Sequence, residues 1–342
     1  MRRRDFLRRA GGGALGLMPA AGLIPRVLMT GRDERLVERW SWVMGQSVVL
    51  KVFADTDDQG YEAAAAALAE LRRIEARLSV FDDASDLSEL NRRAGRPAVS
   101  VGADLLAVLQ AAARFHRLTA GAFDPAVEPL MRAWGFRQPR AGEPSPRELA
   151  AATRAVRECR VTLDGARATL ATAEARLDAG GIAVGYGLDR AAAVLRRHGI
   201  GRALLDISGD CLALGAPPGM RGWPVAVVDS ARPRRNPRIV YLRDAALATS
   251  ANTVSAIRYG RTLAGHVMDP VGGRPASALL QATVVARTGI EADALSTALL
   301  VSAAPAPGVL EWFSPAPLTA SAAPAIGGGR APAVSSGHSP TS

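Results

Sequence analysis

A carboxylate and a hydroxyl stand four residues apart in the segment EADALST, at residues 291–297. In a helix, residues i and i+4 lie on one face, so the side chains of Asp293 and Thr297 would point the same way. Mg²⁺ accepts a few such protein oxygens together with water and substrate phosphates. The pair therefore indicates a magnesium site; the alternative is a first-turn acid that complements the helix dipole.

A histidine and an aspartate, His266 and Asp269, stand three residues apart in GHVMDP at residues 265–270, before a glycine-rich turn. Histidine can act as a base near neutral pH, and a carboxylate can orient it. The alternative is a histidine satisfied by backbone groups beside a capping aspartate.

Two glycine-containing segments could bring the backbone close to a ligand. The first, residues 121–136, contains FDP, a second proline and WGF, and predicts a rigid loop that exposes aromatic rings and a carboxylate. The second, LDAGGIAVGYGLDR at residues 177–190, places glycines before a helix, where phosphate can bind. It lacks the GxGxxG spacing and no clear buried strand precedes it, so a dinucleotide fold is weakly supported. A structural turn and tight glycine packing are the respective alternatives.

The composition excludes several other chemistries. The 342 residues include two cysteines, four histidines and one lysine, too few for a disulfide scaffold, a Cys-type zinc site or a His-rich cluster. Cys159 and Cys211 are predicted to be two independent buried thiols, and the alternative is that they pair in the periplasm. No GxxxxGK[ST] surrounds Lys51, which argues against a P-loop. The net charge of +10 suggests an acidic partner, but no RRM, helix-turn-helix or zinc pattern accompanies it, so no nucleic-acid partner is expected.

The N-terminal residues 1–26 read as a targeting segment. Arg3-Arg4-Asp5-Phe6-Leu7-Arg8 resembles the twin-arginine export signature, and small apolar residues follow. We predict export to the periplasm or the periplasmic face of the inner membrane; a basic amphipathic helix or a membrane anchor is the alternative. Removal of the segment would take half of the net charge, because it holds six arginines against one aspartate.

Helices and strands must position these residues, and both are visible in the residue pattern. Apolar spacing predicts helices over residues 61–78, 104–119 and 291–302, one that begins with the capping box at 145–148, and one that runs through 195 to a cap at Gly199. Strands are predicted at 47–54, 203–208, 225–229, 238–242 and 282–286, with a hairpin at 159–171. The mixture favours an α+β fold. Residues 314–342, rich in Ala, Pro, Ser and Gly, are predicted to be disordered.

In their order and wording, these segments resemble the ApbE-like family, the FAD:protein FMN transferases. That family carries an FDP…PL…WGF segment, LDxGGIAKGYxxD, a GGD turn, ATSG…HxxDPxxGxP and an ADALST helix. The matching segments here are residues 123–136, 177–189, 208–210, 248–275 and 292–297. Residues 44–46 and 85–91 look like the family's early MGT and DSELSRLN. The resemblance implies a flavin transferase domain over residues 38–302, with T-fold-related mixed sheets, packed helices and FAD in a cleft between two subdomains.

The resemblance also implies the site. FAD would be lined by Met44, Phe81, Ala122, Phe123, Asp124, Asp178, Val184, Thr249 and His266. Mg²⁺ would be held by the Gly181 carbonyl, Asp293 and Thr297, with Ser296 adjacent. His266 would help to activate the acceptor hydroxyl, and Asp269 would orient or support it.

The implied reaction transfers FMN from FAD to a Thr or Ser hydroxyl of a partner protein and releases AMP. The acceptor would be a membrane-bound redox subunit. The alternatives are a flavin carrier or accessory maturation factor with little transferase activity, and hydrolysis of FAD to FMN and AMP. The departures that favour a flavin carrier are Val184 where the family usually has Lys, and Ala251 in place of the Gly of ATSG; Ser208 in place of the first Gly of GGD is milder. Hydrolysis would need only water as the acceptor.

Overall fold

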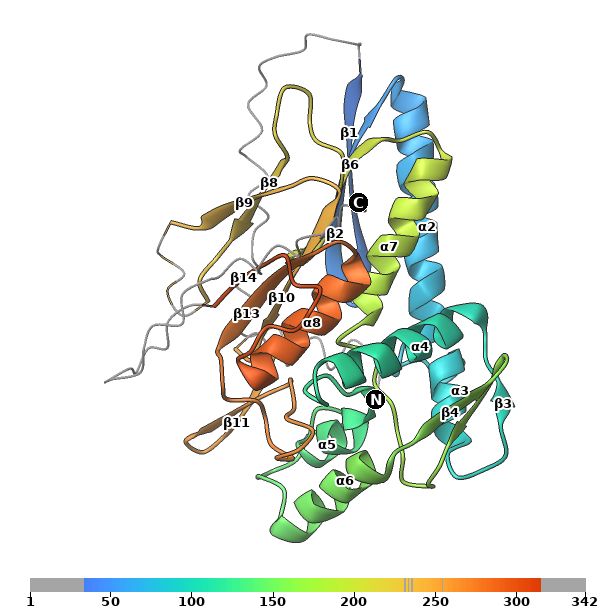
Figure 1. The fold of residues 1–342 in the computed structure, drawn as a ribbon, viewed down its shortest axis with the longest axis vertical. Coiled ribbons are helices and arrows are strands. Elements are labelled where there is room, and N and C mark those ends of the chain that lie inside the picture. The colour runs from blue at the N-terminus through green and yellow to red at the C-terminus, as the bar shows by residue number, and fades with distance from the viewer. Residues whose placement is uncertain (1–33, 231, 233, 235, 254, 315–342) are drawn as a thin grey trace, which may run out of the picture.

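A seven-stranded antiparallel sheet forms the centre of the computed structural model, in the order β1-β2-β6-β7-β10-β13-β14 (Figure 1). The structure describes residues 34–314, apart from positions 231, 233, 235 and 254. The predicted export signal over residues 1–26 and the predicted tail beyond Ser314 lie outside the described residues. The strands of the central sheet are β1 (Arg35–Val43), β2 (Gln46–Ala54), β6 (Arg202–Ile207), β7 (Asp210–Leu214), β10 (Ala245–Ala251), β13 (Gln281–Ala286) and β14 (Glu311–Phe313).

Three small sheets accompany the central one. They are formed by β8 (Trp223–Val227) with β9 (Arg238–Leu242), by β11 (Ala256–Tyr259) with β12 (Thr262–Gly265), and by β3 (Val99–Ser100), β5 (Arg167–Leu170) and β4 (Val161–Asp164). The β4–β5 hairpin turns at Gly165, whose φ of +55° suits the predicted Asp-Gly turn.

Three helices cover one face of the central sheet: α2 (Asp57–Leu78), α7 (Ala183–Arg197) and α8 (Gly289–Ser302) (Figure 1). The remaining helices gather beyond one end of this layer: α3 (Asp86–Arg92), α4 (Ala103–Leu118), α5 (Glu128–Ala133) and α6 (Pro146–Glu158), with the 3₁₀ turn η1 (Pro125–Val127). This arrangement confirms the α+β class. The placement of FAD in a cleft between two subdomains stays a prediction.

The two faces of the central sheet bury different residues. On the helix-covered face, small side chains such as Ala246, Ala248 and Ala282 let α8 pack closely. On the other face, Leu247 and Val285 join a cluster under the β8–β9 hairpin. This alternation along β10 follows from the two-residue period of a strand, and it decides which side chains of that strand can reach α8.

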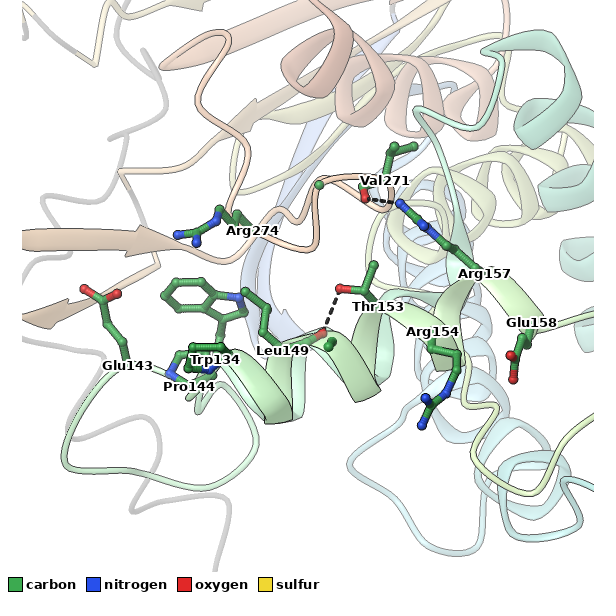
Figure 2. Close-up of a pocket in the computed structure, with 13 residues that line it drawn as sticks. Trp134, Glu143, Pro144, Leu149, Thr153, Arg154, Arg157, Glu158, Val271 and Arg274 are labelled. Atoms are coloured by element: carbon green, nitrogen blue, oxygen red, sulfur yellow. Dashed lines mark hydrogen bonds between the residues drawn. The ribbon is translucent and has the colours of Figure 1, made fainter.

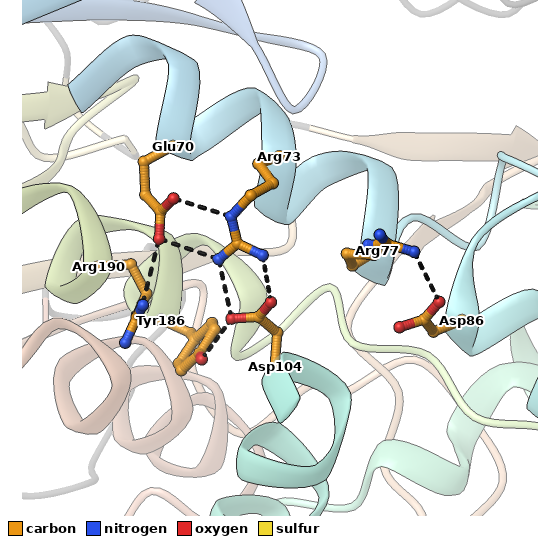
Figure 3. A network of polar contacts seen from close by, with 7 residues as sticks. All are labelled: Glu70, Arg73, Arg77, Asp86, Asp104, Tyr186 and Arg190. Carbon is orange, nitrogen blue, oxygen red and sulfur yellow. Dashed lines mark hydrogen bonds and ion pairs between the residues drawn. The ribbon is translucent and has the colours of Figure 1, made fainter. Parts of the chain in front are cut away.

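A polar network joins α2 and α7 to α4 (Figure 3). Arg73 of α2 forms ion pairs with Glu70 and Asp104, and the Tyr186 hydroxyl donates to Asp104 Oδ1 at 2.8 Å. Arg73 lowers the pKa of the Asp104 carboxyl, which stays ionised in spite of its partial burial. Through Asp104, the network holds the first turn of α4 against α2 and the first turn of α7.

Most predicted elements are confirmed within one to four residues, including the capping box on α6 and the left-handed Gly199 after α7. The residue pattern did not predict α3, β1, β3, β7, β10, β11, β12 and β14, and the segment predicted as a rigid loop at residues 121–136 contains η1 and α5. On β1, Trp40 and Trp42 are 57% and 60% exposed. Apolar side chains on this strand therefore do not mark a buried face, and the usual alternation of apolar and polar residues could not reveal the strand. No described helix is both long and apolar enough to span a membrane.

Candidate active site

Hydroxyl groups from β10 and α8 meet where the helix lies on the sheet. The Ser250 hydroxyl is 2.8 Å from Ser296 Oγ and 3.3 Å from Thr297 Oγ1. The Ser296 hydroxyl is also within hydrogen-bond distance (3.0 Å) of the Asp293 backbone carbonyl, to which it can donate. Thr297 is thus the α8 hydroxyl with the fewest competing partners in this group.

The glycine segment before α7 reaches the same place. A Cβ on Gly181 would lie 3.0 Å from Thr297 Oγ1 and 3.5 Å from the Phe123 ring. Farther along, a Cβ on Gly185 would collide with the Gly289 carbonyl oxygen, so a glycine at this position allows α7 and α8 to approach each other. Tight glycine packing is therefore confirmed at Gly185, and an approach of the segment to a ligand stays a prediction.

The Asp293 carboxylate faces the start of α7. Its Oδ2 accepts a hydrogen bond of 2.9 Å from the Gly185 N–H. Burial raises the pKa of Asp293 to about 7, although the hydrogen bonds from the backbone of Gly185 and Val184 lower it. Burial also raises the pKa of Asp210, which faces Asp293 and accepts from the Thr249 N–H. A cation beside Asp293 would relieve this cost.

The donor set at this point suits Mg²⁺. It offers the Asp293 carboxylate and the hydroxyls of Thr297 and Ser250, all oxygen, with Gly181 in contact. Within the described residues, no group of three or more His, Cys, Asp or Glu side chains could hold a metal. Substrate phosphates or water would have to complete the coordination. Ser250 was not among the sequence-predicted ligands.

The predicted aromatic loop lies beside this oxygen set, but the prediction that it exposes its aromatic rings is wrong, because Phe123, Trp134 and Phe136 are all buried. Phe123 is 3% exposed and packs edge-on against Phe115, with ring centroids 6.2 Å apart. Asp124 caps η1 by accepting from the Ala126 N–H at 2.8 Å, and burial raises the pKa of its carboxyl. Ala122 is half-buried next to them. Phe123 is therefore the member of this loop that the structure brings to Gly181.

A second charged group surrounds Asp178. Asp178 Oδ2 is paired with the Arg137 guanidinium, and its Oδ1 accepts from the Gly180 N–H at 2.6 Å. The Arg137 guanidinium also lies 5.0 Å from the centroid of the Phe81 ring, which is 62% exposed. The two predicted FAD residues, Phe81 and Asp178, are thus joined through an arginine that sequence reasoning did not select.

His266 lies directly after β12 and is half-buried. Its Nδ1 is buried and has no hydrogen-bond partner among the described residues. Burial lowers the pKa of His266, against a hydrogen bond with the Ser255 backbone and the negative charge of Asp178. The ring is therefore neutral at neutral pH, the form in which it can accept a proton.

Asp269 makes a turn instead of holding His266. Its Oδ1 accepts from the Val271 N–H at 2.9 Å, and its backbone carbonyl accepts from Gly273. In the described part of the chain, no hydrogen bond joins the side chains of Asp269 and His266. Of the two predicted roles, direct orientation finds no contact here, and support through the turn stays a prediction.

Three further predicted residues occupy less direct positions. The Thr249 hydroxyl bonds Thr283 Oγ1 on the sheet face that points away from α8. Val184 is 8% exposed in the first turn of α7 and brings no charge. The Met44 side chain packs against Gly187 of α7, and its backbone has a φ of +55°. Their contacts with FAD stay predictions.

A cavity of about 730 Å³ lies between α6 and the turn at residues 270–274 (Figure 2). The turn is fastened to the helices because Trp134 Nε1 donates to the Gly273 carbonyl and Arg157 donates to the Val271 carbonyl. None of the predicted site residues lines this cavity. It borders the turn that follows His266 in the chain.

Comparison with known proteins gives one consistent result. The family model described as the ApbE family matches residues 44–314. A FAD:protein FMN transferase from Treponema pallidum is 32% identical over 248 residues, 68% of this chain and 68% of that protein. One from Vibrio cholerae is 28% identical over 235 residues, 68% and 70% of the two chains.

Solved structures agree with the sequence relatives. The ApbE protein from Thermotoga maritima has a TM-score of 0.72 at 29% identity and covers 79% of this chain and 87% of its own. The flavin transferase ApbE from Vibrio cholerae has a TM-score of 0.68 at 27% identity, covering 78% and 87%.

Proposed function

The chain belongs to the ApbE family, and we propose that, like its curated relatives, it is a FAD:protein FMN transferase. The observation that carries the proposal is the meeting of three family segments at one point. The glycine segment contributes Gly181, the aromatic loop Phe123, and α8 Thr297, with Asp293 one turn away. These segments are far apart in sequence, so their contact is a product of the fold.

The reaction that we propose is a phosphoryl transfer. The acceptor oxygen of a Thr or Ser side chain attacks the phosphorus on the FMN side of the FAD diphosphate. The bond from that phosphorus to the bridging oxygen breaks, and AMP leaves with the bridging oxygen. The hydroxyl proton goes to the neutral His266 ring, whose low pKa keeps it available as an acceptor.

We propose that Mg²⁺ binds at Asp293 and Thr297, with the Gly181 carbonyl. When bound, it neutralises charge that develops on the diphosphate. The chain's own contribution is to hold these oxygens in place: Asp293 is buried against the Gly185 N–H, and Thr297 is adjacent to the Ser250 hydroxyl. A cation also balances a carboxylate that burial makes costly to ionise.

The cellular setting is proposed from the N-terminal sequence. The twin-arginine pattern supports export, and a periplasmic enzyme would modify acceptors that face the periplasm, such as membrane-bound redox subunits.

The proposal is tested by incubating the purified chain with FAD, Mg²⁺ and a domain that carries an acceptor threonine. We expect the acceptor to gain the mass of an FMN group and an equal amount of AMP to appear. The matched control replaces the acceptor threonine by alanine. AMP without modified acceptor would identify FAD hydrolysis, and FAD binding without either product would identify a flavin carrier.

A further inference from the structure

Arg137 lies between two carboxylates at the edge of the predicted FAD site. Its side chain is 11% exposed, although arginine is seldom buried without partners. Its Nε is 3.3 Å from Glu128 Oε1, and its guanidinium pairs with Asp178 Oδ2. The side chain thus connects α5 to the segment that leads into α7.

Glu128 is the fixed end of this connection. Its side chain is fully buried in the first turn of α5, and Oε1 accepts from both Arg132, at 2.9 Å, and Arg137. Its Oε2 is buried, and no residue in the described part of the chain forms a hydrogen bond with it. A buried carboxylate in this position is costly unless a cation stays beside it, so it holds Arg137 strongly.

Asp178 is the end that faces the site. Both of its oxygens are occupied, one by Arg137 and the other by the Gly180 N–H. This fixes the direction of the carboxylate at the start of the glycine segment. The same guanidinium lies over the Phe81 ring, so one side chain sets both predicted FAD contacts.

We infer that Arg137 is a positioning residue for FAD binding: anchored by Glu128, it holds the Asp178 carboxylate in the orientation that receives FAD. The inference rests on the proposed function, because it requires FAD to bind at Asp178. It predicts that Arg137 contributes to FAD affinity through Asp178. Loss of Arg137 should therefore lower FAD affinity without unfolding the rest of the chain.

The test is a double-mutant cycle on FAD affinity, measured by titration of flavin fluorescence in the full chain. We expect Arg137→Gln and Asp178→Asn each to weaken FAD binding about tenfold, and the double variant to be no weaker than the worse single variant. Arg137→Lys should recover part of the affinity, because the charge remains while the two-carboxylate fork is lost.

Arg132→Gln is the matched control, since Arg132 contacts the same Glu128 oxygen, is 57% exposed and does not touch Asp178. It should leave FAD affinity unchanged. If Arg137→Gln does not fold, Glu128→Gln combined with Asp178→Asn gives the same cycle. If the double variant in either cycle lost FAD affinity by the product of the two single losses, the two residues would act independently, and the inference would be overturned. Failure of the unmodified chain to bind FAD would instead contradict the proposed function.

Discussion

The metal end and the base end of the proposed site are built in different ways. At the metal end, Asp293 and Thr297 share one face of α8, which packs on the central sheet and on α7. At the base end, His266 follows a short two-stranded hairpin, and its Nδ1 has no hydrogen-bond partner within the described residues. The comparison teaches that regular elements place the proposed metal ligands, whereas a turn carries the group proposed to accept a proton from the acceptor protein.

Burial shifts the pKa at both ends of the site, but in opposite directions. It raises the pKa of Asp293 to about 7 and lowers that of His266, so each group is pushed toward its neutral form. At the metal end the neutral form is a cost that a cation removes. At the base end the neutral form is the active one.

The largest effect is expected from Asp293→Ala. Loss of the only carboxylate in the oxygen set should lower metal-dependent turnover on the order of a thousandfold or more. AMP release at saturating FAD and several Mg²⁺ concentrations measures it. Glu291→Ala is the control, because its carboxylate lies on the same helix and pairs with Arg114 instead of joining the oxygen set. Unchanged turnover in Asp293→Ala would contradict the proposal that Asp293 holds the metal.

The next effect is expected at the base end. His266→Ala should lower FMN transfer about a hundredfold, the usual contribution of a positioned general base, while FAD affinity changes little. The measurement pairs single-turnover transfer with a flavin fluorescence titration. Equal losses of rate and affinity would show that His266 binds FAD and does not accept the proton.

A third prediction concerns stability without metal. Because the pKa of Asp293 is about 7 in the folded protein and near 4 when unfolded, the folded state binds more protons between these values. The free energy of unfolding of the metal-free chain should therefore fall as pH rises from 4 to 7. Asp293→Asn should reduce this slope and stabilise the metal-free chain by about 2 kcal/mol at pH 7.5.

Chemical unfolding in the presence of a chelator, at pH 5 and pH 7.5, measures this difference. The same variant should be inactive, which separates stability from function at one position. A slope that is unchanged in Asp293→Asn would mean that another buried carboxyl, such as Asp210, carries the linkage.

The residue pattern predicted the metal end better than the base end, for physical reasons. Helical spacing alone put Asp293 and Thr297 on one face, and the helix α8 was predicted within two residues of its start. Ser250 and Thr249 are neighbours, and only the strand face, set by packing, shows that Ser250 reaches α8. The ion pair between Glu128 and Arg137 could not be predicted, because nothing in the local sequence indicates that the two charges are buried together.

The smallest effect should separate the turn from the charge of Asp269. Asp269→Ala removes the acceptor of the Val271 N–H and should cost about 1 kcal/mol of stability and a few-fold of transfer rate. Asp269→Asn keeps a side-chain oxygen in the same place, so it should stay close to the unmodified chain. Thermal unfolding and the rate of FMN transfer measure both variants. If Asn proved as harmful as Ala, the negative charge would matter, and Asp269 would belong with His266 in the chemistry of the base end. If only Ala is harmful, the base end depends on the geometry of its turn, as the hydrogen bonds of residues 269–274 indicate.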